Sequence, residues 1–177
     1  QSGAVWVITQ PGTTAQTEVE LMPASAYSNM VFGASIAISA AGDLLVAGAP
    51  GSPVSATPLA YVFRYDGVDW VEEWHATGLP GDDLGYSVAI DAAGEVLAAG
   101  APRRTYSGYN TGIVEVYRYQ AGVWVHDASV WPPVVGGITY AGNVIALSND
   151  GCLLAMRSGG YTNGVVYLFQ HLGATWT

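Results

Sequence analysis

The chain contains no lysine, only one cysteine and few charged residues of either sign. Charged residues make up 11% of its 177 residues, and 14 acidic residues against five arginines give a net charge of −9. Since no basic patch is available to displace counterions, nucleic acid is excluded as an expected partner. Cys152 has no second cysteine with which to form an internal disulfide, so the sequence gives no indication of the redox compartment.

Long uninterrupted hydrophobic runs are also missing, although half of the residues are hydrophobic. Two uncharged stretches, residues 44–63 and 128–149, approach the length of a membrane span, but prolines and glycines interrupt both. We therefore expect no membrane span. No helical period of adequate length appears, whereas short apolar or alternating runs recur between turn-forming residues. The chain is predicted to be all-β.

What the sequence contains instead is a repeated motif, a Phe-Gly or Leu-Gly pair followed by Gly-Ala-Pro. Two copies are complete, and a degraded third copy covers residues 141–156. The spacing is 52 residues from Gly33 to Gly85 and 57 residues from Gly85 to Gly142. Such a period predicts stacked units, none of which buries its hydrophobic face alone. The motif residues are Phe32, Gly33, Gly48, Ala49, Pro50, Leu84, Gly85, Gly100, Ala101 and Pro102.

Each period contains four strand-like runs joined by short turns. The run expected to be first carries aromatic residues, as at residues 70–74. In the second, small and branched side chains alternate, as at residues 35–39. The third, residues 44–49, is continuously apolar, which is typical of a strand covered on both faces. The fourth is exemplified by residues 60–65. Four antiparallel strands repeated at this interval are typical of a β-propeller blade, in which glycine and alanine allow neighbouring blades to approach.

We therefore predict β-propeller blades of four antiparallel strands in one domain, residues 1–177. The repeats are expected at about 5–69, 70–123 and 124–176, with the chain beginning in a fourth strand. A seven-bladed ring would need roughly 350–400 residues at this period. About three repeats leave two open sheet surfaces, so the chain is expected to be part of a larger propeller, often seven-bladed, or of a self-completing assembly.

The two complete motifs resemble the FG-GAP repeats of the integrin α-chain propeller and its relatives, and the likeness covers nearly the whole chain. The resemblance implies an extracellular or cell-surface module that is not an enzyme. Such a module acts by protein–protein contact in adhesion, or as a structural assembly subunit in contact with neighbouring blades or subunits. A minority of proteins with this repeat carry it as an accessory module on an enzyme.

Many FG-GAP repeats bind calcium through an Asp-x-Asp-x-Asp-Gly loop in the hairpin between the second and third strands. In this chain the hairpins are shortened to residues 39–43, 91–95 and 148–152. Calcium takes six to eight oxygen ligands, which one or two acidic side chains on a tight turn do not supply. We predict plain β-turns and no cofactor, with bound calcium as the alternative.

The long connections on the opposite face are the expected recognition surface, because loops on a rigid scaffold often carry binding residues. In the richest, residues 103–110, two arginines accompany two tyrosines, a combination suited to a sugar ring or a protein contact. The alternative is that the tyrosines cover loop backbone and the arginines cap carbonyl groups. The predicted ligand-binding residues are Arg103, Arg104, Tyr106, Tyr109, Asn110, Tyr161 and Asn163.

Catalytic motifs are weak in this sequence. The three histidines are scattered without metal-ligand spacing. The adjacent carboxylates Asp82 and Asp83 are expected to be solvated rather than an acid–base dyad. We therefore expect a non-enzymatic protein-contact module. The alternatives are a carbohydrate-binding propeller and an accessory domain of a larger enzyme.

Overall fold

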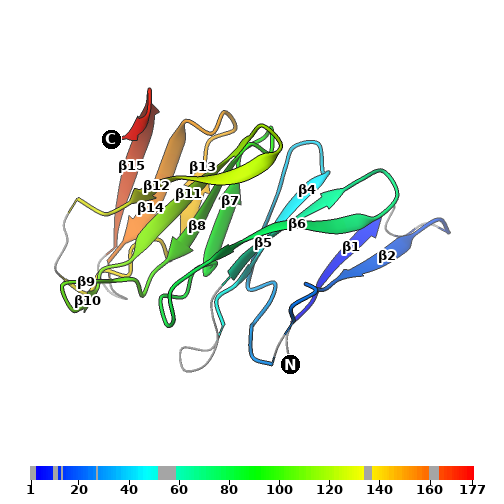
Figure 1. Cartoon of the computed structure of the whole chain (residues 1–177), viewed down its shortest axis with the longest axis horizontal. Coiled ribbons are helices and arrows are strands. Elements are labelled where there is room, and N and C mark those ends of the chain that lie inside the picture. The colour runs from blue at the N-terminus through cyan, green and yellow to red at the C-terminus, as the bar shows by residue number, and fades with distance from the viewer. Residues whose placement is uncertain are drawn as a thin grey trace.

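The computed structural model describes residues 3–9, 12, 14–26, 28–51, 59–133, 137–159 and 164–177. These residues form strands, turns and loops, so the all-β prediction is confirmed. None of the described residues forms a helix long and apolar enough to cross a membrane. Three four-stranded antiparallel sheets follow one another along the molecule, as Figure 1 shows.

The sheets are built from strands that are neighbours in the chain. The first sheet has the order β3 (Ser35–Ile38), β4 (Leu44–Ala49), β5 (Leu59–Tyr65) and β6 (Trp70–Thr77). The second has the order β7 (Ser87–Ile90), β8 (Val96–Ala101), β11 (Ile113–Gln120) and β12 (Val123–Val130). The third has the order β13 (Ile145–Leu147), β14 (Leu153–Ser158), β15 (Val165–Leu172) and β16 (Thr175–Trp176).

Two short hairpins complete the described structure. At the N-terminal end, β1 (Val5–Thr9) pairs with β2 (Thr17–Leu21) and packs against the first sheet. Between β8 and β11, the chain forms β9 (Thr105–Tyr106) and β10 (Tyr109–Asn110). The first hairpin therefore covers the outer face of the first sheet. The prediction that the chain begins in a fourth strand stays a prediction.

The sheets are offset by one strand from the sequence repeats. The aromatic run expected to open a repeat forms β6, which is the last strand of the first sheet. A tight turn explains this pairing, because the Asp66 carboxylate accepts hydrogen bonds from the amides of Val68 and Asp69, both at 2.8 Å. The spacing of a repeat does not show at which strand a sheet begins. The turn at Asp66 joins β5 and β6 as a hairpin, so β6 belongs to the first sheet.

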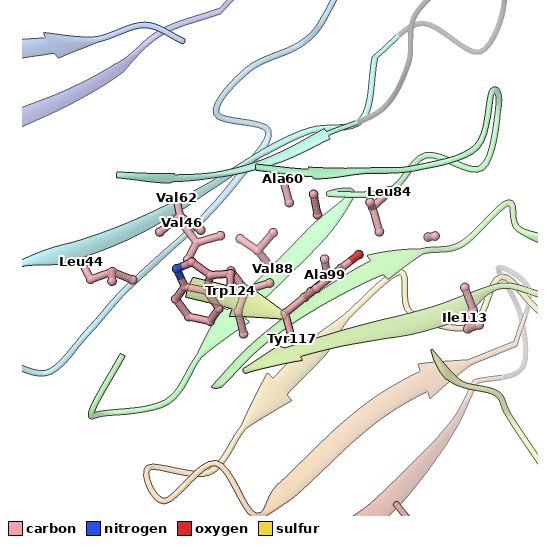
Figure 2. Close-up of a cluster of buried hydrophobic side chains, with 13 residues drawn as sticks. Leu44, Val46, Ala60, Val62, Leu84, Val88, Ala99, Ile113, Tyr117 and Trp124 are labelled. Carbon is pink, nitrogen blue, oxygen red and sulfur yellow. The ribbon is translucent and has the colours of Figure 1, made fainter. Parts of the chain in front are cut away.

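The hydrophobic core lies between successive sheets. In the cluster between the first and second sheets, Val46 and Val62 lie beside Tyr117 and Trp124, as Figure 2 shows. The rings of Trp74 and Trp124 stack across this boundary, with centroids 6.0 Å apart. Because β4 and β8 are covered on both faces, all their residues are buried, as the continuous apolar run at residues 44–49 predicted.

The repeated glycines bring the inner strands together. In each complete copy, the amide of the first motif glycine donates to the carbonyl of the second, at 2.9 Å from Gly33 to Gly48 and 3.0 Å from Gly85 to Gly100. Between sheets, the Ser35 hydroxyl donates to the Gly85 carbonyl at 2.8 Å. The Ser87 hydroxyl donates to the Gly142 carbonyl in the same way, at 2.6 Å. We call this serine–glycine arrangement the inter-sheet clasp.

Candidate functional site

The long connections after β6, β8 and β12 meet at one end of the second and third sheets (Figure 1). A turn of the same shape leads into β3, β7 and β13. Val31, Asp83 and Tyr140 each adopt a positive φ, of 56°, 59° and 46° respectively. In each copy the amide three residues later closes the turn on that residue's carbonyl, at 3.0–3.3 Å. The three copies of the repeat thus share one turn conformation, whereas their side chains at these positions differ.

A cavity of about 110 Å³ lies beside the second and third of these turns. We call it the loop-face pocket. It combines one carboxylate, two guanidinium groups, two phenol groups and a carboxamide. The lining residues are Asp83, Tyr86, Pro102, Arg103, Tyr140, Asn143, Arg157 and Gly159.

Asp83 is the charged group most enclosed in this pocket. Its Oδ2 atom lies 3.2 Å from Nε of Arg103, whose side chain is 45% exposed. Burial raises the pKa of the Asp83 carboxyl, while Arg103 opposes the rise and Asp82 adds to it. The Oδ1 atoms of Asp83 and Asn143 are buried and have no hydrogen-bond partner among the described residues. Two acceptors beside the pocket thus lack a donor.

Arg104 has a different role from its neighbour Arg103. Its side chain is only 17% exposed and lies 2.6 Å from Oδ2 of Asp82 and 3.1 Å from Oε1 of Glu115. The Asp82 carboxylate also accepts hydrogen bonds from the amides of Leu79 and Leu84. Arg104 therefore holds two loops onto the second sheet. The expectation that Asp82 and Asp83 are solvated was wrong, since they are 3% and 6% exposed; Arg104 and the turn backbone bind Asp82, and the pocket encloses Asp83.

The other predicted ligand-binding residues lie apart from the pocket lining. Tyr106 and Tyr109 face each other across the β9–β10 hairpin, and both are exposed. The Tyr106 ring packs edge-on against Trp131, with centroids 5.5 Å apart. Asn110 accepts hydrogen bonds on its carbonyl from the amides of Thr139 and Tyr140. Tyr161 and Asn163 lie outside the described residues.

Of the predicted residues that the structure describes, only Arg103 lines the loop-face pocket. Sequence reasoning missed the residues that line it from the two turns. A comparison of the three copies position by position would have found a signal, because polar residues replace Val31 and Ala34 in the later copies. The missed residues are Asp83, Tyr86, Tyr140 and Asn143.

The shortened hairpins use their carboxylates internally. Asp43 accepts from the Ser39 hydroxyl at 2.8 Å, and Asp91 accepts from the amides of Glu95 and Val96. The described residues contain no group of three or more His, Cys, Asp or Glu side chains that could hold a metal ion. The absence of bound calcium stays a prediction.

Comparisons with known proteins support the fold. Neither a family model nor a curated protein matches the chain. Among solved structures, the chain is similar to the β-propeller domain of Cps50 (Swd1) from Myceliophteria thermophila, with a TM-score of 0.65 and 14% identity. The match covers 100% of this chain and 53% of the other, so this chain spans about half the length of that domain. The predicted fold class, part of a β-propeller, is confirmed.

Proposed function

We propose that the chain is part of a non-catalytic β-propeller that works by protein–protein contact, as an extracellular adhesion or assembly module of the FG-GAP kind. The observation that carries this proposal is an exposed apolar surface on the third sheet, which we call the open face. Its apolar residues and their exposed fractions are Val144 (57%), Leu153 (45%), Val166 (64%) and Leu168 (73%).

The same positions are covered in the other two sheets. By strand register, Leu153 and Leu168 of the open face correspond to Leu44 and Val62 of the first sheet. Leu44 and Val62 are fully buried beneath the second sheet. An apolar surface of this kind is normally covered, either by another sheet of the same protein or by a partner. The repeat itself indicates its partner, the apolar face of another β-sheet.

The third sheet lacks the residues of the inter-sheet clasp. Val144 occupies the position that Ser35, whose hydroxyl forms the clasp, has in the first sheet. Arg157 occupies the position of Gly48, which allows the close approach of the next sheet. A sheet packed on the open face therefore cannot use the clasp that joins the first three. Contact at the open face would therefore depend on apolar packing rather than on the clasp.

The chemistry of the described histidines supports a non-catalytic role. Each lies near a carboxylate of its own or the adjacent sheet: His75 near Glu72, His126 near Glu115 and His171 near Asp127. The Asp82 carboxylate is already bound by Arg104 and two backbone amides. His75, His126 and Asp82 thus have structural partners, which favours a scaffold over an active site.

Sedimentation of the purified chain tests the proposed contact surface. We expect concentration-dependent association, which Leu168→Arg should abolish, because a charge would be buried in the apolar contact. Val68→Arg is the matched control, since Val68 is equally exposed but lies in the β5–β6 turn. A monomeric wild-type chain at all concentrations, or association that persists in Leu168→Arg, would contradict the proposal.

A further inference from the structure

We propose that the loop-face pocket binds a neutral, hydroxyl-rich ligand, a saccharide. This site lies at the loop end of the second and third sheets, and although Arg157 borders both sites, none of the four apolar residues that carry the proposed protein contact lines the pocket. The proposal is therefore independent of that contact. It rests on the polar side chains that line the pocket and on the way they depart from the first repeat.

The first repeat shows what the fold requires at these positions. Val31, Ala34 and Gly51 stand there where the second repeat has Asp83, Tyr86 and Arg103. The two loops make corresponding hydrogen bonds, since the amide of Gly51 donates to the carbonyl of Met30 at 3.0 Å and that of Arg103 to the carbonyl of Asp82 at 3.1 Å, although Gly51 has a φ of 70° and Arg103 does not adopt a positive φ. The turn therefore forms without a polar residue at any of the three positions. The polar set is not needed for folding, and all three side chains line one cavity.

The unpaired groups define the ligand that fits. The Oδ1 atoms of Asp83 and Asn143 lack a hydrogen-bond donor, and both are buried, so a ligand reaches either one only after the side chain turns. Rotation about the Asp83 Cβ–Cγ bond, which is a soft torsion, exchanges its two carboxylate oxygens and turns either one toward the pocket. Arg103 and the phenol groups of Tyr86 and Tyr140 are donors that a ligand oxygen can accept from. A hydroxyl group does both at once, so an array of hydroxyl groups matches this mixture.

Charge argues against an ionic ligand. Asp83 is already paired with Arg103 at 3.2 Å. An ammonium group would lie between the guanidinium groups of Arg103 and Arg157, and a carboxylate would face Asp83. A neutral ligand meets neither repulsion and supplies the missing donors.

The size and rim of the pocket suit a sugar. A volume of about 110 Å³ is several times the roughly 10–15 Å³ that a cavity needs, on the same measure, to hold one water molecule. Tyr86 is half exposed, so its ring is accessible from solvent at the pocket edge. An aromatic ring there provides an apolar surface for the C–H face of a sugar, and its hydroxyl remains free to hydrogen-bond.

Substitutions that restore the first repeat are the sharpest test. Asp83→Val and Tyr86→Ala each introduce the residue that the first copy carries on the same backbone turn, and Arg103→Gly introduces the glycine that the first copy carries at the corresponding position. The chain is therefore expected to fold with each of them, and thermal unfolding checks this. The double variant Tyr106→Ala/Tyr109→Ala is the control, since it removes exposed tyrosines from the nearby hairpin but none from the pocket lining.

Binding is measured by NMR titration of the isotope-labelled chain with glucose, galactose, mannose and N-acetylglucosamine. Their methyl glycosides represent sugars attached to a glycan, whereas the free sugars represent soluble saccharides. Glucosamine and glucuronate serve as cationic and anionic probes. We expect at least one neutral sugar to shift the amide signals of residues 83–86, 103 and 140–143, with a Kd of about 1 mM. Asp83→Val and Arg103→Gly should each weaken this binding about tenfold or more, and the hairpin control should bind like the wild type.

Three outcomes would overturn the proposal. The first is that no neutral sugar shifts the pocket signals at concentrations well above the expected Kd. The second is that glucosamine, glucuronate or a short charged peptide binds more tightly than every neutral sugar. The third is that the first-repeat variants, shown to be folded, bind sugars as well as the wild type does.

Discussion

Gly48 in the first sheet lies against the backbone carbonyl of Gly85 in the second, so closely that a Cβ atom built on Gly48 would be 1.9 Å from that oxygen. Gly100 has the same relationship to Gly142, at 2.0 Å. No side chain fits at such a separation, because backbone atoms of both sheets would have to move apart. The glycine of Gly-Ala-Pro is therefore required by the neighbouring sheet rather than by its own strand.

Substitution of this glycine should loosen the contact between two sheets. Gly48→Ala is expected to lower the free energy of unfolding by about 2–4 kcal/mol, because the added methyl group forces the inner strands apart. Gly137→Ala is the matched control, since a Cβ at Gly137 would meet nothing within 4 Å. Urea unfolding followed by tryptophan fluorescence measures both. Equal stability of Gly48→Ala and Gly137→Ala would show that the sheets are not held at this separation.

The adjacent arginines Arg103 and Arg104 should differ sharply in their effect on stability. Arg104→Ala leaves the buried carboxylates of Asp82 and Glu115 without their shared cation and should cost about 3–5 kcal/mol. Arg103→Gly removes the 45% exposed partner of one buried carboxylate, Asp83, and should cost less, about 1–2 kcal/mol. Thermal and urea unfolding of the two variants check this order. Similar losses would contradict the assignment of Arg104 to the scaffold and Arg103 to the pocket.

Removal of calcium should leave the protein unchanged. The Asp43, Asp91 and Asp150 carboxylates accept hydrogen bonds within their own turns and lie on separate hairpins. Calcium would need several of them together, because it takes six to eight oxygen ligands. We expect the same Tm in excess EDTA and in millimolar calcium. A fall in Tm with EDTA that calcium reverses would contradict the prediction of no bound calcium.

The fold could be predicted from the sequence because each residue of the repeated motif has a strict spatial role. The paired glycines and the apolar runs before Gly48 and Gly100 determine where strands lie and which faces are covered. The strand at which each sheet begins was not predictable from the spacing of the repeats. It depends on the hydrogen bonds of Asp66 in the β5–β6 turn, a local feature that lies outside the motif.

The candidate site was harder to predict, because exposure and pairing depend on tertiary contacts. Arg103 and Arg104 are indistinguishable in sequence, but only Arg104 reaches Glu115, eleven residues later on β11. Asp83 resembles a solvated loop residue until the turn places it, at φ 59°, beside the pocket. Differences between aligned copies of the repeat would have been a better guide to this site than loop composition.

The pH dependence of stability should reveal the enclosed carboxyl of Asp83. Burial raises its pKa above the ordinary value of 3.8, so the folded protein binds this proton more tightly than the unfolded chain does. The corresponding stabilisation is fully present below about pH 3.8 and is lost as the pH rises through the raised pKa. Asp83→Asn removes this titration. The Tm of the wild type should therefore fall relative to that of Asp83→Asn as the pH rises above 3.8.

Asp150 provides a control of opposite sign. The Ser148 hydroxyl and the Cys152 amide lower the pKa of this exposed carboxyl, so its stabilisation is present above pH 3.8 and is lost as the pH falls through the lowered pKa. Relative to that of Asp150→Asn, the Tm of the wild type should fall only when the pH drops below about 3.8. Thermal unfolding of the three proteins from pH 2.5 to about pH 7 covers both windows. If Asp83→Asn and the wild type change in parallel across this range, Asp83 is solvated and the pocket does not enclose its carboxyl.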